Sequence, residues 1–534
     1  MAKSRFLLLL LMANMSLGFA QSSYFFVQFK DKKCTIPASI SLSQKAIQRR
    51  QNQHIQLDSS DFSVNLEYVS KLKHFSNLTF LYASKWENGI LVQCDKSIAH
   101  NIKNELFVKE VRNLGEVRNC DSQKQALMSV SQNEEISYGN SFAQIQNLGA
   151  DKMHEEGITG KGIYVAVFDG GFRNTDQVTS LKPLFEDKRI KFTYDIVSNL
   201  LDVYTKHTHG TNVLSCLAGY APGNLIGTGY GADFALIISE DVGSERLVEE
   251  YNWLRAAEIA DSLGVDIISS SLGYYSFDIA SENHVLSDLD GKTSIITKAA
   301  KMATRKGILV VNSAGNNYGD TQWRNIVFPC DADSVLSVGA TNPDGTKASF
   351  SAIGPTVDGR VKPDVSALGV GVVINSTGTS FFDASGTSYS APLVAGLAAG
   401  LWQLDSTLTN IELLNAIKQS ANLYCAQNNQ IGAGIPNYSL AAQLIRDRTQ
   451  INCELAAGIS MYPNPVLDMV TFEFGMESFE IDLDYQLLDI SGREMMSGSG
   501  GNLGNLNLKL DLRTLKSGVY FLKLDQKIHK IIKL

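Results

Sequence analysis

A serine in front of an apolar helix pattern is the first residue of this chain whose setting could support chemistry. Ser388 lies in Ser385-Gly386-Thr387-Ser388-Tyr389-Ser390-Ala391-Pro392, which leads into a Gly/Ala-rich apolar stretch from Leu393 to Leu404. In the first turn of a buried helix, unpaired backbone N–H groups and the helix dipole favour developing negative charge. A serine there could attack an acyl carbon, although a serine at a helix start is more often a cap.

Two motifs upstream offer a carboxylate and a base. The apolar, β-branched run that ends in Asp169-Gly170-Gly171 predicts a strand buried on both faces, with Asp169 at its carboxyl end. His209 precedes Gly210 at the start of a short predicted helix over 212–218. Taken singly, Asp169 could cap a turn and His209 could be a surface residue. His207 and His209 as metal ligands are a further alternative.

The spacing of these motifs gives the chain order Asp169, His209, Ser388, the three groups that a catalytic triad requires. Between His209 and Ser388, the apolar run 307–312 predicts another buried strand, and Asn316 follows it closely. An amide at that sheet edge could donate a hydrogen bond to an oxyanion. Turn chemistry alone would also account for Asn316.

With these four motifs in this order, the sequence from about residue 137 to 448 resembles the subtilisin-like serine proteases. The resemblance implies that Asp169, His209 and Ser388 form the triad and that Asn316 is the oxyanion-hole residue. It also implies that the extended segment containing Ser271, Leu272 and Gly273 binds the substrate backbone.

Two acidic residues follow the strand predicted over 234–239. By position, Glu240 and Asp241 resemble the part of the family's site that flanks the substrate just before the scissile bond. Carboxylates there would favour Lys or Arg upstream of the cut, most strongly at low salt. A solvated acidic turn is the alternative interpretation.

The sequence departs from the family pattern beside the triad. Gly170 follows Asp169 where the family usually has Ser or Thr, so a hydroxyl that would steady the carboxylate is missing. Gly231-Ala232-Asp233-Phe234 stands where the family commonly has Gly-Val-Ala-Pro. We expect these departures to affect the substrate specificity and the catalytic rate more than the presence of activity.

The region 137–448 alternates predicted strands with predicted helices, which indicates an α/β fold with a doubly wound parallel sheet of the subtilisin type. The predicted strands are 163–168, 234–239, 265–270, 308–312 and 335–340, and the predicted helices are 249–263 and 294–306.

Three further segments precede this region. Residues 1–20 combine Lys3 and Arg5 with a short apolar run and a small-residue end, which predicts a secretory signal peptide. Residues 21–120 predict a small α+β unit that resembles the family's propeptide, with a plain accessory domain as the alternative. Residues 121–136 are polar and are the predicted linker and cleavage zone.

The tail, residues 458–534, reads as short strands separated by turns, which predicts a small antiparallel β-sandwich. Its motifs resemble the C-terminal sorting domain of the type IX secretion system. The resemblance implies passage through the periplasm, contact with outer-membrane secretion machinery and a secreted or cell-surface protein. A substrate-binding β-module is the alternative.

Composition and charge restrict the classes of partner and the covalent cross-links that we expect for this chain. The 534 residues carry a net charge of −8 without a strong basic cluster, so nothing indicates nucleic acid binding. No later segment is apolar for long enough to predict a membrane span in the mature chain. Seven cysteines do not form a disulfide scaffold, and Cys425 with Cys453 is the favoured pairing.

No Cys or His set has zinc spacing, and we expect no metal at the catalytic site. We expect that the chemistry requires no cofactor. The acidic turn Asp288-Leu289-Asp290-Gly291 leaves a structural calcium ion open, although short acidic loops are usually only solvated.

The sequence thus predicts a secreted serine endopeptidase that acts on polypeptides through an acyl-enzyme intermediate. The alternative from another class is a disabled scaffold of the same fold that serves as a cell-surface binding protein.

Overall fold

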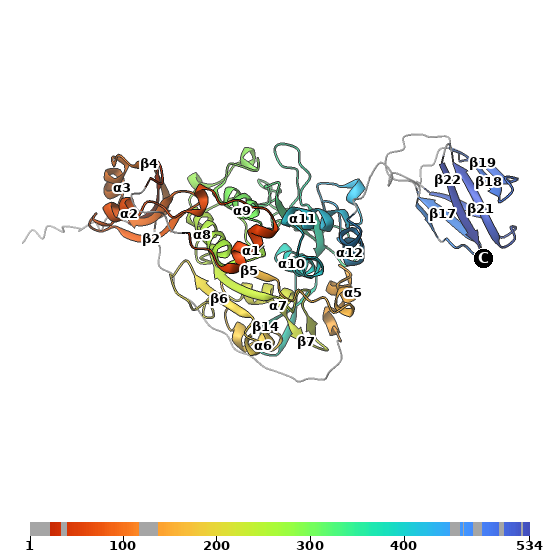
Figure 1. Ribbon diagram of the computed structural model, residues 1–534, viewed down its shortest axis with the longest axis horizontal. Coiled ribbons are helices and arrows are strands. Elements are labelled where there is room, and N and C mark those ends of the chain that lie inside the picture. Colours follow the sequence, from red (N-terminus) through yellow and green to blue (C-terminus); the bar gives the residue numbers. More distant parts are fainter. Residues whose placement is uncertain are drawn as a thin grey trace, which may run out of the picture.

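The computed structural model describes residues 22–33, 40–116, 137–448, 460–462, 464–473, 483–500, 507–524 and 527–534. The predicted signal peptide, the predicted linker 121–136 and Cys453 lie outside these residues. The described segments form an N-terminal unit, a large central region and a C-terminal set of strands (Figure 1). Within the described residues, no helix is both long and apolar enough to cross a bilayer.

The central region is built on a seven-stranded sheet in the order β13-β12-β11-β10-β5-β9-β6, and all its neighbouring strands run parallel. The strands are β5 (Tyr164–Asp169), β6 (Ile190–Asp195), β9 (Asp233–Ile238), β10 (Ile267–Ser270), β11 (Leu309–Ser313), β12 (Val335–Thr341) and β13 (Val365–Leu368). This confirms the predicted doubly wound α/β fold.

Strand β5 is buried along its whole length because its side chains alternate between two cores. Val165 and Val167 pack into one core, together with α7 (His209–Ala218) and α10 (Thr387–Leu404). Tyr164, Ala166 and Phe168 pack into the other, together with α8 (Val248–Leu263) and α9 (Ile295–Arg305). The helices therefore cover both faces, which forces the functional groups to the sheet's edge.

The N-terminal unit is a four-stranded antiparallel sheet in the order β2-β3-β1-β4, with helices beside it. Its elements are β1 (Ser23–Phe29), α1 (Gln44–Asn52), α2 (Leu66–Lys73), β2 (Thr79–Ser84), β3 (Gly89–Cys94), α3 (Lys96–Lys103) and β4 (Val108–Glu116). One face of this sheet joins the core around α8, where the ring centroids of Phe26 and Tyr251 are 4.7 Å apart.

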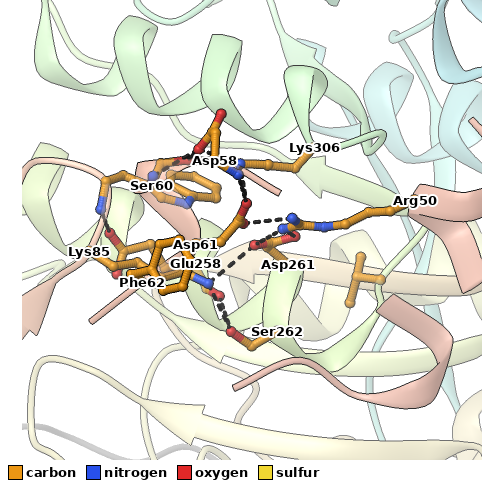
Figure 2. A network of polar contacts seen from close by, with 12 residues as sticks. Arg50, Asp58, Ser60, Asp61, Phe62, Lys85, Glu258, Asp261, Ser262 and Lys306 are labelled. Atoms are coloured by element: carbon orange, nitrogen blue, oxygen red, sulfur yellow. Dashed lines mark hydrogen bonds and ion pairs between the residues drawn. The ribbon is translucent and has the colours of Figure 1, made fainter. Parts of the chain in front are cut away.

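Buried charges tie the N-terminal unit to the central region (Figure 2). Arg50 of α1 binds Asp61 of its own unit at 2.6 Å and Asp261 of α8 at 2.8 Å. Asp61 in turn binds Lys306, which follows α9, at 3.0 Å, and Arg49 also reaches Asp261, at 2.7 Å. Opposite charges thus alternate across the contact, so no member of the cluster is left uncompensated.

The electrostatic state of Asp261 follows from this cluster. Burial by itself would raise its pKa, but the charges of Arg49, Lys85 and Arg50 outweigh burial and lower the pKa. A carboxyl group with a lowered pKa stabilises the folded state above its unfolded pKa, and that contribution is lost as the pH falls through the folded pKa. Asp261 is therefore charged at neutral pH, and its contribution to the contact weakens in acid.

The C-terminal strands form two antiparallel sheets, β16-β17-β20 and β19-β18-β21-β22. The strands are β16 (Ser460–Tyr462), β17 (Met469–Glu473), β18 (Leu483–Asp489), β19 (Glu494–Gly500), β20 (Asn507–Asp511), β21 (Gly518–Leu524) and β22 (Lys527–Lys533). Val470 and Leu510 of the first sheet share a core with Leu487 and Leu522 of the second. This confirms the predicted sandwich, which has a core of its own.

The structure adds elements that the sequence did not predict, among them α2, β6, β13, β16 and β19. The edge strand β6 is an instructive case, because Lys191 is exposed and only Asp195 is fully buried. A strand that has one neighbouring strand and one solvent-exposed face lacks the continuous apolar run from which the central strands were predicted.

Replacing Arg50 by Ala should lower the free energy of unfolding by about 3–5 kcal/mol, because Asp61 and Asp261 would keep buried charge with too few partners. Urea titration followed by tryptophan fluorescence measures this change, in a chain that also carries Ser388→Ala so that it cannot cleave itself. Lys152→Ala, which removes an exposed pair with Glu155, is the matched control and should change nothing measurable. Equal stability of the two variants would contradict the argument.

Candidate active site

Asp169 is the last residue of β5 and is fully buried. The N–H of Gly170 donates to its Oδ1 at 2.8 Å. Nδ1 of His209 lies 2.9 Å from both carboxylate oxygens. A buried carboxylate bound in this way holds the imidazole in one orientation and leaves its Nε2 as the outward-facing nitrogen.

His209 is the first residue of α7, which comes unusually close to the end of β5. A Cβ added to Gly210 would lie 2.6 Å from the carbonyl oxygen of Gly171 and 2.9 Å from Cβ of Asp169. Only glycine permits that approach, so Gly210 sets the distance between the histidine and the carboxylate.

Burial alone would lower the pKa of His209. The charge and hydrogen bond of Asp169, with a smaller contribution from Glu240, outweigh burial and raise the pKa to about 8. The imidazole can therefore exchange a proton near neutral to mildly alkaline pH. The neighbouring His207 is exposed, and its Nδ1 accepts the backbone N–H of His209 at 3.3 Å.

Ser388 is the second residue of α10, and it is 8% exposed. Pro392, one turn further on, has no N–H to donate to the Ser388 carbonyl. The hydroxyl of Ser271 donates to that carbonyl instead, at 2.9 Å. The proline thus leaves an acceptor free, and Ser271 uses it to tie the start of α10 to the segment that follows β10.

The first turn of α10 is a neighbour of the imidazole, since the ring centroids of Tyr389 and His209 are 6.1 Å apart. Within the described part of the chain, Oγ of Ser388 makes no hydrogen bond to His209. Such bonds are often long without substrate and tighten when it binds.

Asn316 lies beyond the end of β11, facing the same helix start. Its side-chain oxygen accepts the backbone N–H and the hydroxyl of Thr387, both at 2.9 Å. These two donors fix which end of the amide is oxygen and therefore turn the NH2 group away from Thr387. Within the described residues this NH2 group has no protein acceptor, so it is available to a ligand.

The predicted substrate-binding segment lies next to Ser388. Ser271 and Leu272 are buried, and the Leu272 carbonyl accepts Nδ2 of Asn312 at 2.8 Å. A Cβ on Gly273 would lie 2.2 Å from Val327, so close packing requires glycine here. The segment is thus held rigidly at the carboxyl edge of the sheet, beside β10 and β11.

Glu240 and Asp241, predicted as a pair, have different surroundings. A Cβ on Gly170 would lie 3.4 Å from Oε2 of Glu240, so the Glu240 side chain points toward the residue after Asp169. Asp241 lines a cavity of about 280 Å3 between the segments 194–199 and 241–252 of the central region and the N-terminal unit. Gly170 therefore provides the space that a family-typical Ser or Thr would take from Glu240 and Val242.

Sequence reasoning did not identify the roles of Thr387 and Pro392, nor the carboxylates of Glu245 and Glu249 beside Glu240. The signal for Glu249 was present, because Glu249 and Glu250 stand together in the first turn of a helix that is otherwise largely buried.

The acidic turn 288–291, for which the sequence leaves a calcium ion open, has protein partners of its own. Oδ1 of Asp290 accepts the N–H groups of Lys292 and Thr293, and Oδ2 of Asp288 accepts the N–H of Val285. Cys425 is disulfide-bonded, while its predicted partner Cys453 lies outside the described residues.

Comparison with protein families gives three matches along the chain. The model of the subtilase family matches residues 160–434, more than half of the chain. The peptidase S8 propeptide domain of Bacteroidota matches residues 24–129, and the secretion system C-terminal sorting domain matches residues 460–534.

Similar proteins include Subtilisin NAT of Bacillus subtilis subsp. natto, 29% identical over 322 residues, which are 59% of this chain and 76% of the relative. The thermostable alkaline protease of Halalkalibacterium halodurans is 28% identical over 343 residues, 64% of this chain and 82% of the relative. Among solved structures, MycP1 from the ESX-1 type VII secretion system is 20% identical with a TM-score of 0.47, over 61% of this chain and 90% of that one.

Proposed function

Because the chain belongs to the subtilase family of serine proteases, we propose that it is a serine endopeptidase that hydrolyses polypeptides through Asp169, His209 and Ser388. The observation that carries this proposal is the pair of 2.9 Å contacts between His209 and the buried Asp169. That pair supplies an oriented base beside a helix-start serine, which is what acyl transfer from a peptide requires.

In the proposed reaction, Nε2 of His209 removes the proton from Ser388 as the hydroxyl oxygen attacks the peptide carbonyl. Asp169 keeps the imidazole in the tautomer with its proton on Nδ1 and stabilises the imidazolium that forms. His209 then donates the proton to the leaving amine. Water repeats the sequence on the acyl-enzyme and releases the acid.

The oxyanion of each tetrahedral intermediate is bound by the NH2 group of Asn316 and the backbone N–H of Ser388. Support for Asn316 comes from the two bonds from Thr387 that orient its amide before substrate arrives. A donor fixed in advance needs no reorganisation during the reaction, which makes it effective. No step requires a metal ion or another cofactor.

Substrate backbone is proposed to bind along Ser271, Leu272 and Gly273, which the Ser271–Ser388 hydrogen bond holds at a fixed distance from the nucleophile. Asp241 is proposed to attract a cationic side chain upstream of the scissile bond. Glu240 supports that preference only through its charge, because its carboxylate points inward toward Gly170.

The propeptide and the sorting tail make this a secreted or cell-surface protein that is produced as a zymogen. We propose that residues 1–20 direct export to the periplasm, that cleavage falls within 121–136, and that the tail engages outer-membrane secretion machinery.

Replacing Ser388 by Ala should lower kcat by about 10⁶-fold, the scale of nucleophile loss in subtilisin. Asn316→Ala should cost about 10²–10³-fold in kcat, as expected for one oxyanion donor. Hydrolysis of a chromogenic peptide by the purified, matured chain measures both. If a serine-directed phosphonate labels neither the parent nor Asn316→Ala, the chain is a disabled scaffold that acts as a binding protein.

Activity should rise with pH across the pKa of His209, because only the neutral imidazole accepts the serine's proton. We expect kcat/KM to increase about tenfold per pH unit below the pKa of about 8 and to level off above it. A pH profile with the same peptide tests this, and a flat profile from mildly acidic to mildly alkaline pH would contradict the assignment of His209.

Replacing Asp241 by Asn should reduce cleavage of peptides that carry Lys or Arg two to four residues upstream of the scissile bond. Other peptides should be cut as before. The reason is the loss of an attractive charge near the substrate, and the effect should shrink at high salt. A peptide-library cleavage profile at two salt concentrations measures it. An unchanged profile would remove the proposed role of Asp241.

Deleting residues 458–534 should leave peptide hydrolysis by matured protein near that of the parent, because the tail has a separate core and the triad lies elsewhere. In the native host, the same deletion should hold the enzyme in the periplasm. Fractionation by immunoblot checks the second outcome. Surface display of the truncated chain, or loss of hydrolysis in vitro, would show that the tail is part of the enzyme.

A further inference from the structure

Three carboxylates meet where β9 leads into α8. Glu240 follows the strand, Glu245 lies in the connection and Glu249 is in the first turn of the helix. One carboxylate oxygen from each lies within 4.8 Å of those of the other two. No part of the proposed reaction uses Glu245 or Glu249, so the cluster requires its own explanation.

The most buried member of the cluster has no partner. Glu249 is 1% exposed, and within the described residues neither of its carboxylate oxygens has a hydrogen-bond partner. Tyr274 is also buried, and its hydroxyl has no hydrogen-bond partner within the described residues. Burying a carboxylate without a donor or a counter-charge is costly, so the site lacks a group that would satisfy it.

The one basic residue inside this segment of sequence, Arg246, is only partly engaged, because its Nε and Nη2 have no hydrogen-bond partner within the described residues. Nη1 of Arg246 donates to the carbonyl of Glu116 at 2.8 Å, and its Nη2 lies 3.6 Å from Glu282. Arg246 thus ties the last residue of β4 to the central region. Among the ion pairs of the described residues, none joins Arg246 to one of the three glutamates.

Access to Glu249 runs through the cavity of about 280 Å3 that Asp241 and Arg246 also line. Glu249 and Ser244 line the same cavity, and Tyr24 and Glu116 of the N-terminal unit form part of its opposite side. A small ion can therefore reach Glu249 although the residue itself is buried.

We propose that Glu240, Glu245 and Glu249 bind a calcium ion. All the available donors are oxygens, which hard divalent cations prefer over the nitrogen and sulfur sets of zinc sites. Calcium–oxygen distances of about 2.3–2.6 Å allow two ligands of one ion to lie roughly 5 Å apart, whereas magnesium allows only about 4 Å. The three oxygens lie within 4.8 Å of one another, a separation that a calcium ion can bridge.

The site would connect the start of α8 to the strand that ends in Asp169. Glu240 is the link, because its Oε2 lies near Gly170, whose N–H binds Asp169. The ion would thus fix the loop 240–247 against the strand β5, at a place different from the acidic turn around Asp290.

The test uses the full chain carrying Ser388→Ala, stripped of metal with a chelator and titrated with CaCl2 by isothermal calorimetry. We expect saturable binding, with Mg2+ binding more weakly. Glu249→Gln and Glu245→Gln should each weaken calcium binding by at least about 10–100-fold, the loss caused by removing even an outer-shell partner. Asp290→Asn is the matched control and should bind calcium like the parent.

Thermal unfolding followed by tryptophan fluorescence provides a second readout, since a ligand of the folded state raises the transition temperature. Calcium should raise it in the parent and in Asp290→Asn, and much less in Glu245→Gln. Should Glu249→Gln fail to fold, Glu245→Gln carries the comparison, because Glu245 is only partly buried. Absence of saturable calcium binding in the parent, or loss of binding in Asp290→Asn with Glu245→Gln unchanged, overturns the proposal.

Discussion

The whole arrangement depends on the burial of a parallel sheet from both sides. Because α7 and α10 cover one face and α8 and α9 the other, polar groups can gather only where the strands end. The last residue of β5 is a carboxylate, and the two helices on the first face begin at His209 and close to Ser388. The same packing that excludes water from the core thus brings an acid, a base and a hydroxyl to one edge.

Small details of backbone chemistry then fix the site. Pro392 has no backbone N–H to donate to the Ser388 carbonyl, so this carbonyl accepts a hydrogen bond from the hydroxyl of Ser271. Thr387 occupies the oxygen of Asn316 and leaves its NH2 group for a ligand. Each contact uses a group that a regular helix end or turn leaves unpaired, so the proposed nucleophile and the proposed oxyanion donor are oriented before substrate binds.

The contact between the propeptide and the catalytic domain follows a different physical logic. Arg50, Asp61, Asp261 and Lys306 alternate in charge and are almost fully buried. A set of this kind tolerates one binding geometry, because any shift leaves a charge unpaired in a low-dielectric environment. The glutamate cluster at the start of α8 is the opposite case, since it gathers like charges that have no ion-pair partner among the described residues. Such a local violation of packing rules is typical of functional sites.

The sequence by itself determined the class of fold, and it predicts the four chemical residues and the division into propeptide, catalytic and sorting parts. It could do so because buried strands, helix starts and turns have short-range patterns, and because Asp169, His209 and Ser388 stand in an informative order. The edge strand β6 was not predicted. It has one neighbouring strand and a partly solvent-exposed surface, so its sequence has little apolar pattern.

Only the tertiary structure decided which residues support those four. In the sequence, Gly170 only removes a hydroxyl next to Asp169, whereas in the structure it makes room for the side chain of Glu240. Glu249 has the sequence pattern of an ordinary acidic residue at a helix start, and only the structure shows that it is buried. These roles depend on distances between segments far apart in the chain, or on burial by other elements, and neither is encoded in the spacing of neighbouring residues.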